Sequence, residues 1–162
     1  MKSRFILQWF ILICIFIVAL VMEIAPWPAG FQSFKPAWLV LILMYWVLSI
    51  PNKIGIGCAF VLGVMWDLVL GSTLGIHALV LSVFTYLMAA NHLLFRNLSL
   101  WLQSLLMMVI VLAIRMSIFV VELFVNTAQF QSQEIVGAVI SGILWPWVFL
   151  LLRKIRQQLD LK

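Results

Sequence analysis

Long apolar runs without a single charge limit this chain more than any other feature of its sequence. One run extends from Phe5 to Met22, directly after Lys2 and Arg4, and another from Ile54 to Trp66. A run of roughly 18 apolar residues is typical of a helix that crosses a membrane. The first run also exceeds the roughly 7–15 apolar residues of a cleavable signal peptide, so we expect it to remain in place. These runs predict an integral membrane protein.

The composition agrees with a membrane location. Hydrophobic residues make up 66% of the chain and charged residues only 9%, whereas soluble domains carry roughly 25% charged residues. A soluble domain of 162 residues could not bury this much apolar surface. The two cysteines, Cys14 and Cys58, lie inside apolar runs without metal-binding spacing. We interpret both as small core or lipid-facing residues.

The alternation of apolar runs and helix-breaking residues predicts six membrane-spanning helices in one all-α domain. The predicted spans are about 5–24, 37–50, 54–70, 74–94, 99–126 and 135–152. A helix needs roughly 20 apolar residues to cross a bilayer, so the second and third spans are short. The fifth is long enough to tilt or to extend past the membrane. We therefore expect a six-helix bundle that occupies residues 1–162.

Basic residues predict the orientation of these helices. With both termini in the cytoplasm, the outside segments contain Lys35 alone. The inside segments then contain Lys2, Arg4, Lys53, Arg96, Arg153, Lys154, Arg156 and Lys162. Because cytoplasmic segments of membrane proteins are enriched in Lys and Arg, this imbalance of eight to one predicts cytoplasmic termini. The basic residues lie at helix ends and not in a patch, so we expect membrane lipids, and no nucleic acid, as their partners.

Small residues recur at every fourth position between Gly55 and Gly75, and only Asp67 interrupts the series. The small residues are Gly55, Ala59, Gly63, Gly71 and Gly75. Positions four apart lie on one face of a helix. Glycine costs about 1 kcal/mol relative to alanine inside a helix in water, so its repetition needs a compensating role. Close approach of a neighbouring helix is such a role in membranes, and we predict a helix-packing seam.

Ionisable side chains at membrane depth are costly and indicate a functional site by default. The candidates are Asp67, His77, Arg115 and Glu122. At a rise of about 1.5 Å per residue, Asp67 and Arg115 lie at similar depths in the outer half of the bundle. We expect these two to form an ion pair that locks the helices together. A binding site for a partner or a substrate is the alternative interpretation of the cluster. Glu23 lies nearer the outer edge and is interpreted as interfacial.

The last predicted span contains Trp145, Pro146 and Trp147 in its middle. Proline removes one backbone hydrogen bond and kinks a helix, and the two tryptophans then point to different sides. Packing and interface anchoring explain this segment, and a groove for a helix of another protein is the alternative.

The sequence contains no recognisable catalytic set. Its carboxylates are few and scattered, and neither a nucleophile–His–Asp set nor an HExxH motif occurs. We therefore expect no enzymatic activity, no bound metal and no cofactor.

Five segments of the chain resemble the MreD family of rod shape-determining membrane proteins, in its enterobacterial type. They are PWP from Pro26, FKPAWLVLILMYW from Phe34, DLVLGSTLG from Asp67, LFRNLSLW from Leu94 and GILWPWVFLLLRKIRQQ from Gly142. The resemblance extends over nearly the whole chain. Its most specific part is carried by Asp67, Gly71, Leu74 and Gly75.

The resemblance implies a non-enzymatic component of the bacterial inner membrane that binds the bitopic protein MreC. Through MreC, the assembly would link MreB filaments to RodA and to the elongation-type penicillin-binding protein that build peptidoglycan. A competing class is a small-molecule-binding membrane transport subunit. A transport subunit should contain a sealed polar cavity, whereas an assembly protein should offer an apolar groove for partner helices.

Overall fold

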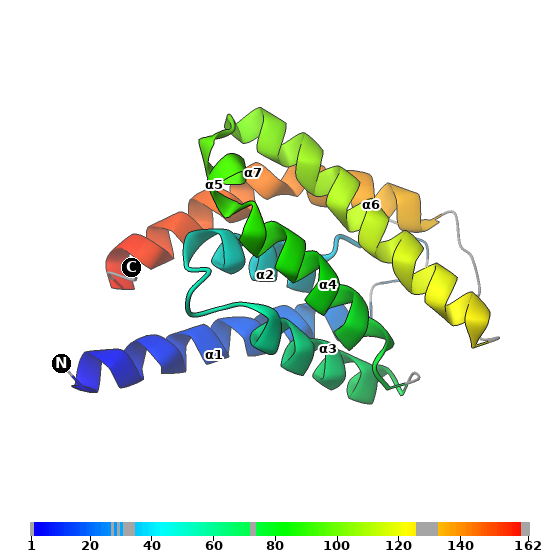
Figure 1. The fold of residues 1–162 in the computed structure, drawn as a ribbon, viewed down its shortest axis with the longest axis horizontal. Helices are drawn as coiled ribbons and strands as arrows, with labels where there is room; N and C mark the ends of the chain where they lie inside the picture. The colour runs from blue at the N-terminus through cyan, green and yellow to red at the C-terminus, as the bar shows by residue number, and fades with distance from the viewer. Residues whose placement is uncertain are drawn as a thin grey trace.

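The computed structural model describes residues 2–26, 28, 30, 35–71, 74–125 and 133–159, which form seven α-helices (Figure 1). The helices are α1 (Lys2–Ile24), α2 (Trp38–Ser49), α3 (Ile56–Leu70), α4 (Ile76–Ala90), α5 (His92–Asn97), α6 (Leu100–Phe124) and α7 (Gln133–Leu159). Three of them, α1, α6 and α7, are long and apolar enough to cross a membrane. The expected all-α class with membrane-capable helices is confirmed, and the count of six spans stays a prediction.

Helix α2 occupies the centre of the fold. All but a few of its 12 residues are buried, from Leu39 to Leu48. A helix that is apolar on every side belongs in the interior, and α1, α4, α5 and α7 pack around it (Figure 1). Its length of roughly 18 Å is too short for a hydrocarbon core of about 30 Å. Because helices and not lipid surround α2, its short length is tolerated.

Helices α3 and α4 form a tight hairpin (Figure 1). Gly71 ends α3 in the left-handed conformation, with φ +66°, and its amide donates to the carbonyls of Asp67 and Leu68. Glycine is the residue that adopts this conformation without strain. Within the hairpin, a Cβ atom on Gly63 would lie 2.3 Å from the Cα atom of Ala78. The two helices therefore meet at the level of their backbones.

Helices α6 and α7 form a second hairpin. The Ser104 hydroxyl donates to the carbonyl of Gly142 across the pair. A Cβ atom on Gly142 would lie 2.6 Å from the Cβ atom of Met108. This hairpin thus also uses a glycine for close helix contact, as membrane helices commonly do.

Two differences from the predicted spans are larger than the others. The predicted span 74–94 is divided at Asn91, whose side chain donates to the Leu87 carbonyl at 2.9 Å. This local bond competes with helix continuation, and α5 begins as a separate element at His92. Helix α7 extends to Leu159, past the predicted end at 152. The predicted outer connection 127–134 lies mostly outside the described residues.

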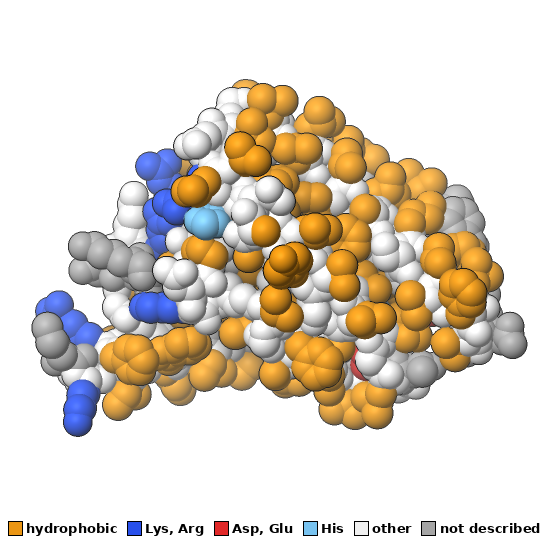
Figure 2. All heavy atoms as spheres, viewed as in Figure 1, with side chains coloured by type: hydrophobic (Ala, Val, Ile, Leu, Met, Phe, Trp, Pro, Cys, Tyr) orange, Lys and Arg blue, Asp and Glu red, His pale blue; other side chains and the backbone are white. Residues whose placement is uncertain are grey.

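The N-terminal end of α1 and the C-terminal end of α7 lie at the same end of the bundle (Figure 1). The Gln8 side-chain amide of α1 donates to the Leu159 carbonyl of α7 at 2.9 Å. Lys and Arg side chains gather at this end, while apolar side chains dominate the rest of the visible face (Figure 2). We call this the terminal end, and the opposite one, with the turn between α3 and α4, the far end.

Candidate functional site

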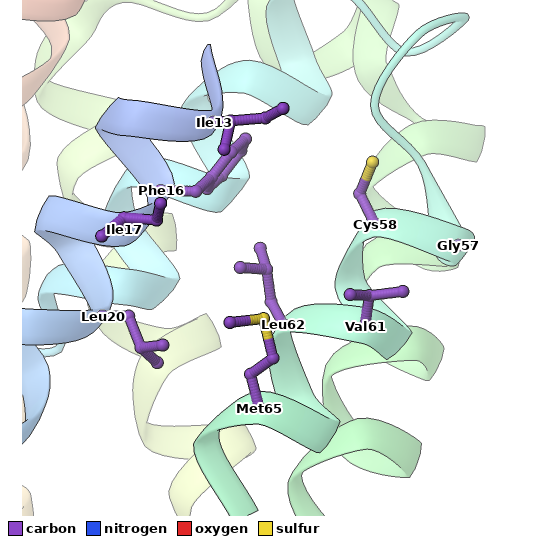
Figure 3. A pocket seen from close by; sticks show the side chains of 9 residues that line it. All are labelled: Ile13, Phe16, Ile17, Leu20, Gly57, Cys58, Val61, Leu62 and Met65. Carbon is purple, nitrogen blue, oxygen red and sulfur yellow. The ribbon is translucent and has the colours of Figure 1, made fainter. Parts of the chain in front are cut away.

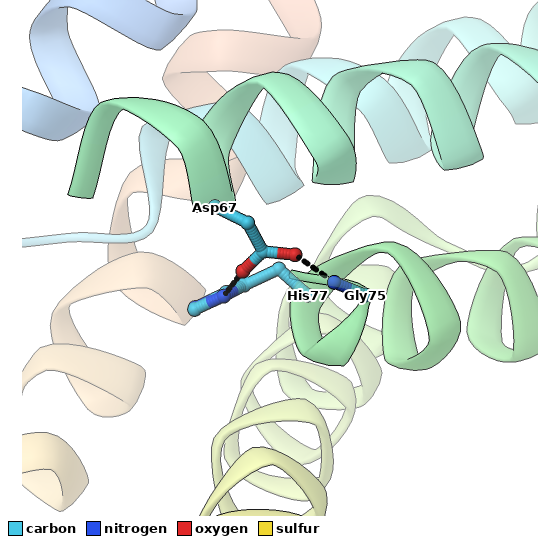
Figure 4. A network of polar contacts seen from close by, with 3 residues as sticks. All are labelled: Asp67, Gly75 and His77. Carbon is cyan, nitrogen blue, oxygen red and sulfur yellow. Dashed lines mark hydrogen bonds and ion pairs between the residues drawn. The ribbon is translucent and has the colours of Figure 1, made fainter. Parts of the chain in front are cut away.

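Asp67 and His77 form a buried pair where α3 meets α4 near the far end (Figure 4). Asp67 is 0% exposed, and its Oδ1 atom lies 2.5 Å from Nδ1 of His77. The amide of Gly75 donates to the Oδ2 atom at 3.0 Å. The start of α4 therefore engages both carboxylate oxygens, and a helix N-terminus favours a negative charge.

The ring of Trp66 covers this pair. Its centroid lies 4.3 Å from that of the His77 ring, with the two planes inclined by 39°. Trp66 itself is 9% exposed. Hydrogen bonds between polar groups are stronger in such a low-dielectric interior, provided that the groups are paired. The pair thus ties α3 to α4 from within the hairpin.

The predicted helix-packing seam from Gly55 to Gly75 includes fewer residues in the structure than the sequence predicted. Gly63 contacts the backbone of α4, and Ala59 is fully buried. Gly71 and Gly75 lie in the turn with positive φ, and a Cβ atom on either would meet nothing within 4 Å. Gly55 precedes α3, and a Cβ there would lie 3.7 Å from the nearest atom. The seam is corrected to the part inside α3, because the helix ends before Gly71 and the periodicity ends with it.

A second polar cluster surrounds the N-terminus of α2; we call it the α2 N-terminal cluster and define it as Glu23, Lys35, Leu39 and Arg115. The Leu39 amide donates to Oε2 of Glu23 at 3.5 Å. Nη2 of Arg115 donates to the Lys35 carbonyl at 3.5 Å, and Nζ of Lys35 donates to the Ala25 carbonyl at 3.2 Å. The charges of Lys35 and Arg115 both act on the Glu23 carboxyl group. Glu23 is only 9% exposed, so other protein atoms cover it, and its interpretation as a residue near the membrane interface stays a prediction.

Helix α7 completes the surroundings of this cluster. A Cβ atom on Gly137 would lie 2.3 Å from Nη1 of Arg115 and 2.8 Å from the Lys35 carbonyl oxygen. The guanidinium therefore lies against bare backbone. One turn later, the Ser141 hydroxyl accepts from the Ala37 amide at 2.8 Å. Elements α1, α2, α6 and α7 all contribute to one polar junction.

The structure divides the four predicted ionisable residues between different places. Among the residues that the structure describes, the ion pair at Asp67 is with His77, so the predicted pair with Arg115 is corrected. The physical reason is that α4 lies between α3 and α6 (Figure 1). Equal depth does not bring two side chains together when another helix separates them. Glu122 is half-buried on α6 and forms no ion pair with another described residue.

The predicted tryptophan segment of α7 faces two environments. Trp145 is 0% exposed and packs against Tyr45, with ring centroids 6.5 Å apart. Trp147 is 72% exposed, and Pro146 between them is half-buried. The prediction that the two tryptophans point to different sides is confirmed. Because Trp145 is inside the core, it is removed from the predicted partner groove.

Gln103 of α6 is a buried polar residue that the sequence analysis did not select. Its Nε2 atom donates to the Phe95 carbonyl at 2.8 Å and to the Leu98 carbonyl at 3.3 Å. Its Oε1 atom accepts from Nε1 of Trp145 at 3.4 Å. One amide thus joins the α5–α6 elbow to α7. The signal in the sequence was an uncharged polar residue inside a long apolar run.

An apolar groove of about 340 Å³ lies between α1 and α3 (Figure 3). We call it the α1–α3 groove. Its walls are formed by Ile13, Phe16, Ile17 and Leu20 of α1 and by Gly57, Cys58, Val61, Leu62 and Met65 of α3. No charged side chain is among these nine residues, so the groove suits an apolar occupant. The described residues contain no group of three or more His, Cys, Asp and Glu side chains that could hold a metal.

Comparisons with known proteins agree over the length of the chain. A family model described as rod shape-determining protein MreD matches residues 3–155. The curated rod shape-determining protein MreD of Haemophilus influenzae is 61% identical over 161 residues, which cover 99% of each chain. No solved structure matches the chain.

Proposed function

The chain belongs to the MreD family of rod shape-determining proteins, and from this premise we propose that it is a non-enzymatic assembly protein of cell-wall elongation. Its role is in cell shape. We propose that it lies in the bacterial inner membrane as a multi-pass protein and binds MreC. Through MreC it would help to assemble the peptidoglycan synthesis machinery with MreB, RodA and the elongation-type penicillin-binding protein. The observation that carries this proposal is the 61% identity to a rod shape-determining relative over 99% of both chains.

The use of the buried polar groups supports an assembly role. Asp67 is engaged by His77, and Gln103 by Trp145 and two carbonyls, so each joins one helical element to another. Polar groups that are satisfied in this way rigidify a core and specify one arrangement of it. A rigid helical frame is what a protein needs in order to hold partners in fixed positions.

The chemistry of the α1–α3 groove favours assembly over small-molecule transport. Small-molecule sites are mostly apolar but place a few polar groups where they orient the ligand. The nine residues of this groove include only one sulfhydryl, that of Cys58, as a weak polar group. Such a lining suits hydrocarbon or the apolar side of a helix better than a polar nutrient.

We propose that the terminal end faces the cytoplasm. The start of α1, the end of α7 and the visible Lys and Arg side chains lie there (Figures 1 and 2), and cytoplasmic segments are enriched in these residues. Reporter tags fused at Met1 and Lys162 should report the cytoplasm, and one inserted at Gln131 the periplasm. A periplasmic tag signal at Lys162 would refute six spans.

The assembly role is tested by co-purification from membranes. Affinity-tagged full-length chain should retain full-length MreC in mild detergent, and it should retain less of an MreC variant whose membrane helix is replaced by an unrelated apolar helix. Equal recovery of an unrelated single-pass membrane protein would contradict specific binding. Turnover of lipid-linked peptidoglycan precursors by the purified chain alone would contradict a non-enzymatic role.

A further inference from the structure

We propose that the terminal end binds the headgroup of an anionic phospholipid at a step between long and short helices. We call this place the terminal step. Its raised sides are the protruding ends of α1 and α7, and its set-back floor carries Lys53, Arg96 and Trp101. Binding of this lipid does not involve MreC and requires only that the chain lies in a bilayer.

Helix α1 extends toward the terminal end past the start of α3. The α1–α3 groove begins at Ile13 on α1 and at Gly57 on α3, and both helices run in the same direction (Figure 3). The start of α3 is therefore level with Ile13. The preceding residues of α1, 2–12, add a length of roughly 16 Å. Lys53 lies in the turn just before α3, so it is set back from the start of α1 by about this length.

Helix α7 extends past the elbow that joins α5 to α6. Gln103 of α6 accepts from Trp145 of α7 and donates to the carbonyl of Phe95 in α5, which places the elbow beside Trp145. From there α7 continues for about 14 residues to Leu159, a length of roughly 21 Å. Arg96 directly follows Phe95 and is therefore set back as well. Figure 1 shows that α1 and α7 both reach past α2 and α5 at the terminal end.

The protruding end of α1 lies in hydrocarbon. Phe5, Ile6 and Leu7 are consecutive residues, and each is more than half exposed. Consecutive side chains of a helix point to different sides. An exposed helix that is apolar on every side is stable only where lipid surrounds it. The hydrocarbon core of the bilayer therefore reaches α1 as far as Phe5.

The floor of the terminal step carries residues that belong at a membrane surface. Trp101 at the start of α6 is 83% exposed, and tryptophan is enriched where a bilayer meets water. Arg96 is exposed and Lys53 is half-buried, and a charge within hydrocarbon is costly. These residues therefore need headgroups or water at a level where α1 is still in hydrocarbon. The polar surface of the bilayer thus descends from the start of α1 into the terminal step, as it does around helices too short for the bilayer.

The terminal end carries charge of one sign. No described Asp or Glu lies there, and the basic side chains form no ion pair with a described carboxylate. These basic residues are Lys2, Arg4, Lys53, Arg96, Arg153, Lys154 and Arg156. The side chains of Glu23, Asp67 and Glu122 belong to the last turns of α1, α3 and α6, toward the far end (Figure 1). An occupant that balances the terminal end is anionic, whereas a second copy of this chain would bring the same positive charges.

Exposed apolar side chains adjoin these cations. Phe5 directly follows Arg4, and Leu150 and Leu151, each more than half exposed, lie within one turn of Arg153. An occupant that contacts both kinds of side chain has an anionic group joined to hydrocarbon. A phospholipid has this composition, whereas an acidic protein segment offers no hydrocarbon chains to the apolar side chains. Basic pockets between helices at a membrane surface bind anionic phospholipid headgroups in the same way.

Thiol labelling in nanodiscs of phosphatidylglycerol and phosphatidylcholine tests the level of the bilayer surface. Phe5→Cys and Asn52→Cys would each be made in a protein with Cys14→Ala and Cys58→Ala. Phe5 is nearer the terminal end, and Asn52 is exposed in the turn before α3. Asn52→Cys should nevertheless react with a membrane-impermeant maleimide at least roughly tenfold faster, because a thiol in apolar surroundings is less ionised. Both should react equally in denaturing detergent. A flat bilayer surface predicts the reverse order, so faster labelling of Phe5→Cys would overturn the terminal step.

Lipid selectivity tests the charge of the occupant. The full-length chain in detergent would receive equal amounts of phosphatidylglycerol and phosphatidylcholine with the same acyl chains, and native mass spectrometry would count the retained lipids. The wild type should retain phosphatidylglycerol over phosphatidylcholine by at least roughly fivefold, and Lys53→Gln/Arg96→Gln should lower this ratio by at least about threefold. Lys2→Gln/Arg4→Gln removes the same charge from the protruding end of α1 and should change the ratio by less than about twofold. Lys53→Arg/Arg96→Lys keeps both charges and should keep the wild-type ratio.

Three results of the lipid measurement would overturn the proposal. A wild type that retains both lipids equally has no site for an anionic headgroup. Equal losses in the two glutamine variants would show a general attraction between charges and not a site at the terminal step. Displacement of phosphatidylglycerol by poly-glutamate would identify an acidic protein segment as the occupant. None of these measurements contains MreC, so the proposed assembly role is tested separately.

Discussion

Replacing Gly63 by alanine should destabilise the α3–α4 hairpin more than the same change at Gly57. A Cβ atom at Gly63 would lie 2.3 Å from Cα and 2.5 Å from the amide nitrogen of Ala78, and 2.8 Å from the carbonyl carbon of His77. All three are backbone atoms, so no side-chain rotation relieves the contact. The helices must separate by about 1 Å to reach ordinary van der Waals distance. At Gly57, the added methyl group meets nothing within 4 Å.

The magnitude follows from overpacking and helix propensity. Overpacking costs about 1–3 kcal/mol, and alanine returns up to about 1 kcal/mol of helix propensity at either position. After this offset the net cost at Gly63 is up to about 2 kcal/mol. With roughly 2–4 °C of unfolding temperature per kcal/mol for a chain of this size, Gly63→Ala should lower the unfolding temperature by up to about 8 °C. Gly57→Ala should leave it unchanged or raise it by up to about 4 °C. Thermal unfolding in one detergent, followed by tryptophan fluorescence, measures both. Equal unfolding temperatures for the two variants would refute the close contact of α3 with α4.

Four further substitutions, and one double variant, test the buried polar groups and their surroundings, each by unfolding temperature in detergent. Asp67→Asn and His77→Ala should each destabilise the protein by about 3–5 kcal/mol. The double variant should lose less stability than the sum of the two single losses. Strictly additive losses would contradict the pairing of Asp67 with His77. Gly137→Ala would place a methyl group 2.8 Å from the Lys35 carbonyl oxygen, a backbone atom, and should cost about 1–3 kcal/mol. Wild-type stability would show that α7 leaves room there. Gln103→Leu should leave the indole N–H of Trp145 buried without an acceptor and lower the free energy of unfolding by about 1–3 kcal/mol. An unchanged unfolding temperature would show that the hydrogen bond between Trp145 and Gln103 contributes nothing to stability.

The helices and their approximate bounds follow from the sequence, because a transmembrane helix needs an apolar run long enough to cross the bilayer. The predicted span 54–70 corresponds to α3 (Ile56–Leu70), and 99–126 to α6 (Leu100–Phe124). The end of α3 was also predictable, since glycine marks the turn. The central place of α2 was only implied, by an apolar run too short to cross the bilayer alone.

The partners of the buried polar side chains could not be predicted from depth along the helices. The predicted depths of Asp67 and Arg115 are similar, but α4 lies between α3 and α6 (Figure 1). His77, which Asp67 contacts, is close in sequence and across a turn, so the local pairing was available as a signal. Which tryptophan of α7 enters the core depends on the rotation of the helix about its axis. A helix without a strongly apolar side does not reveal that rotation.

The most direct test of the central claim is the shape of cells that lack the protein. The chain would be depleted in a rod-shaped bacterium that carries no second copy, and cell width would be measured over successive generations by phase-contrast microscopy. A role in the assembly of the elongation machinery predicts that rods widen and become round, and that re-expression of the wild-type chain restores them. Rods of normal width after complete loss of the protein would contradict that role.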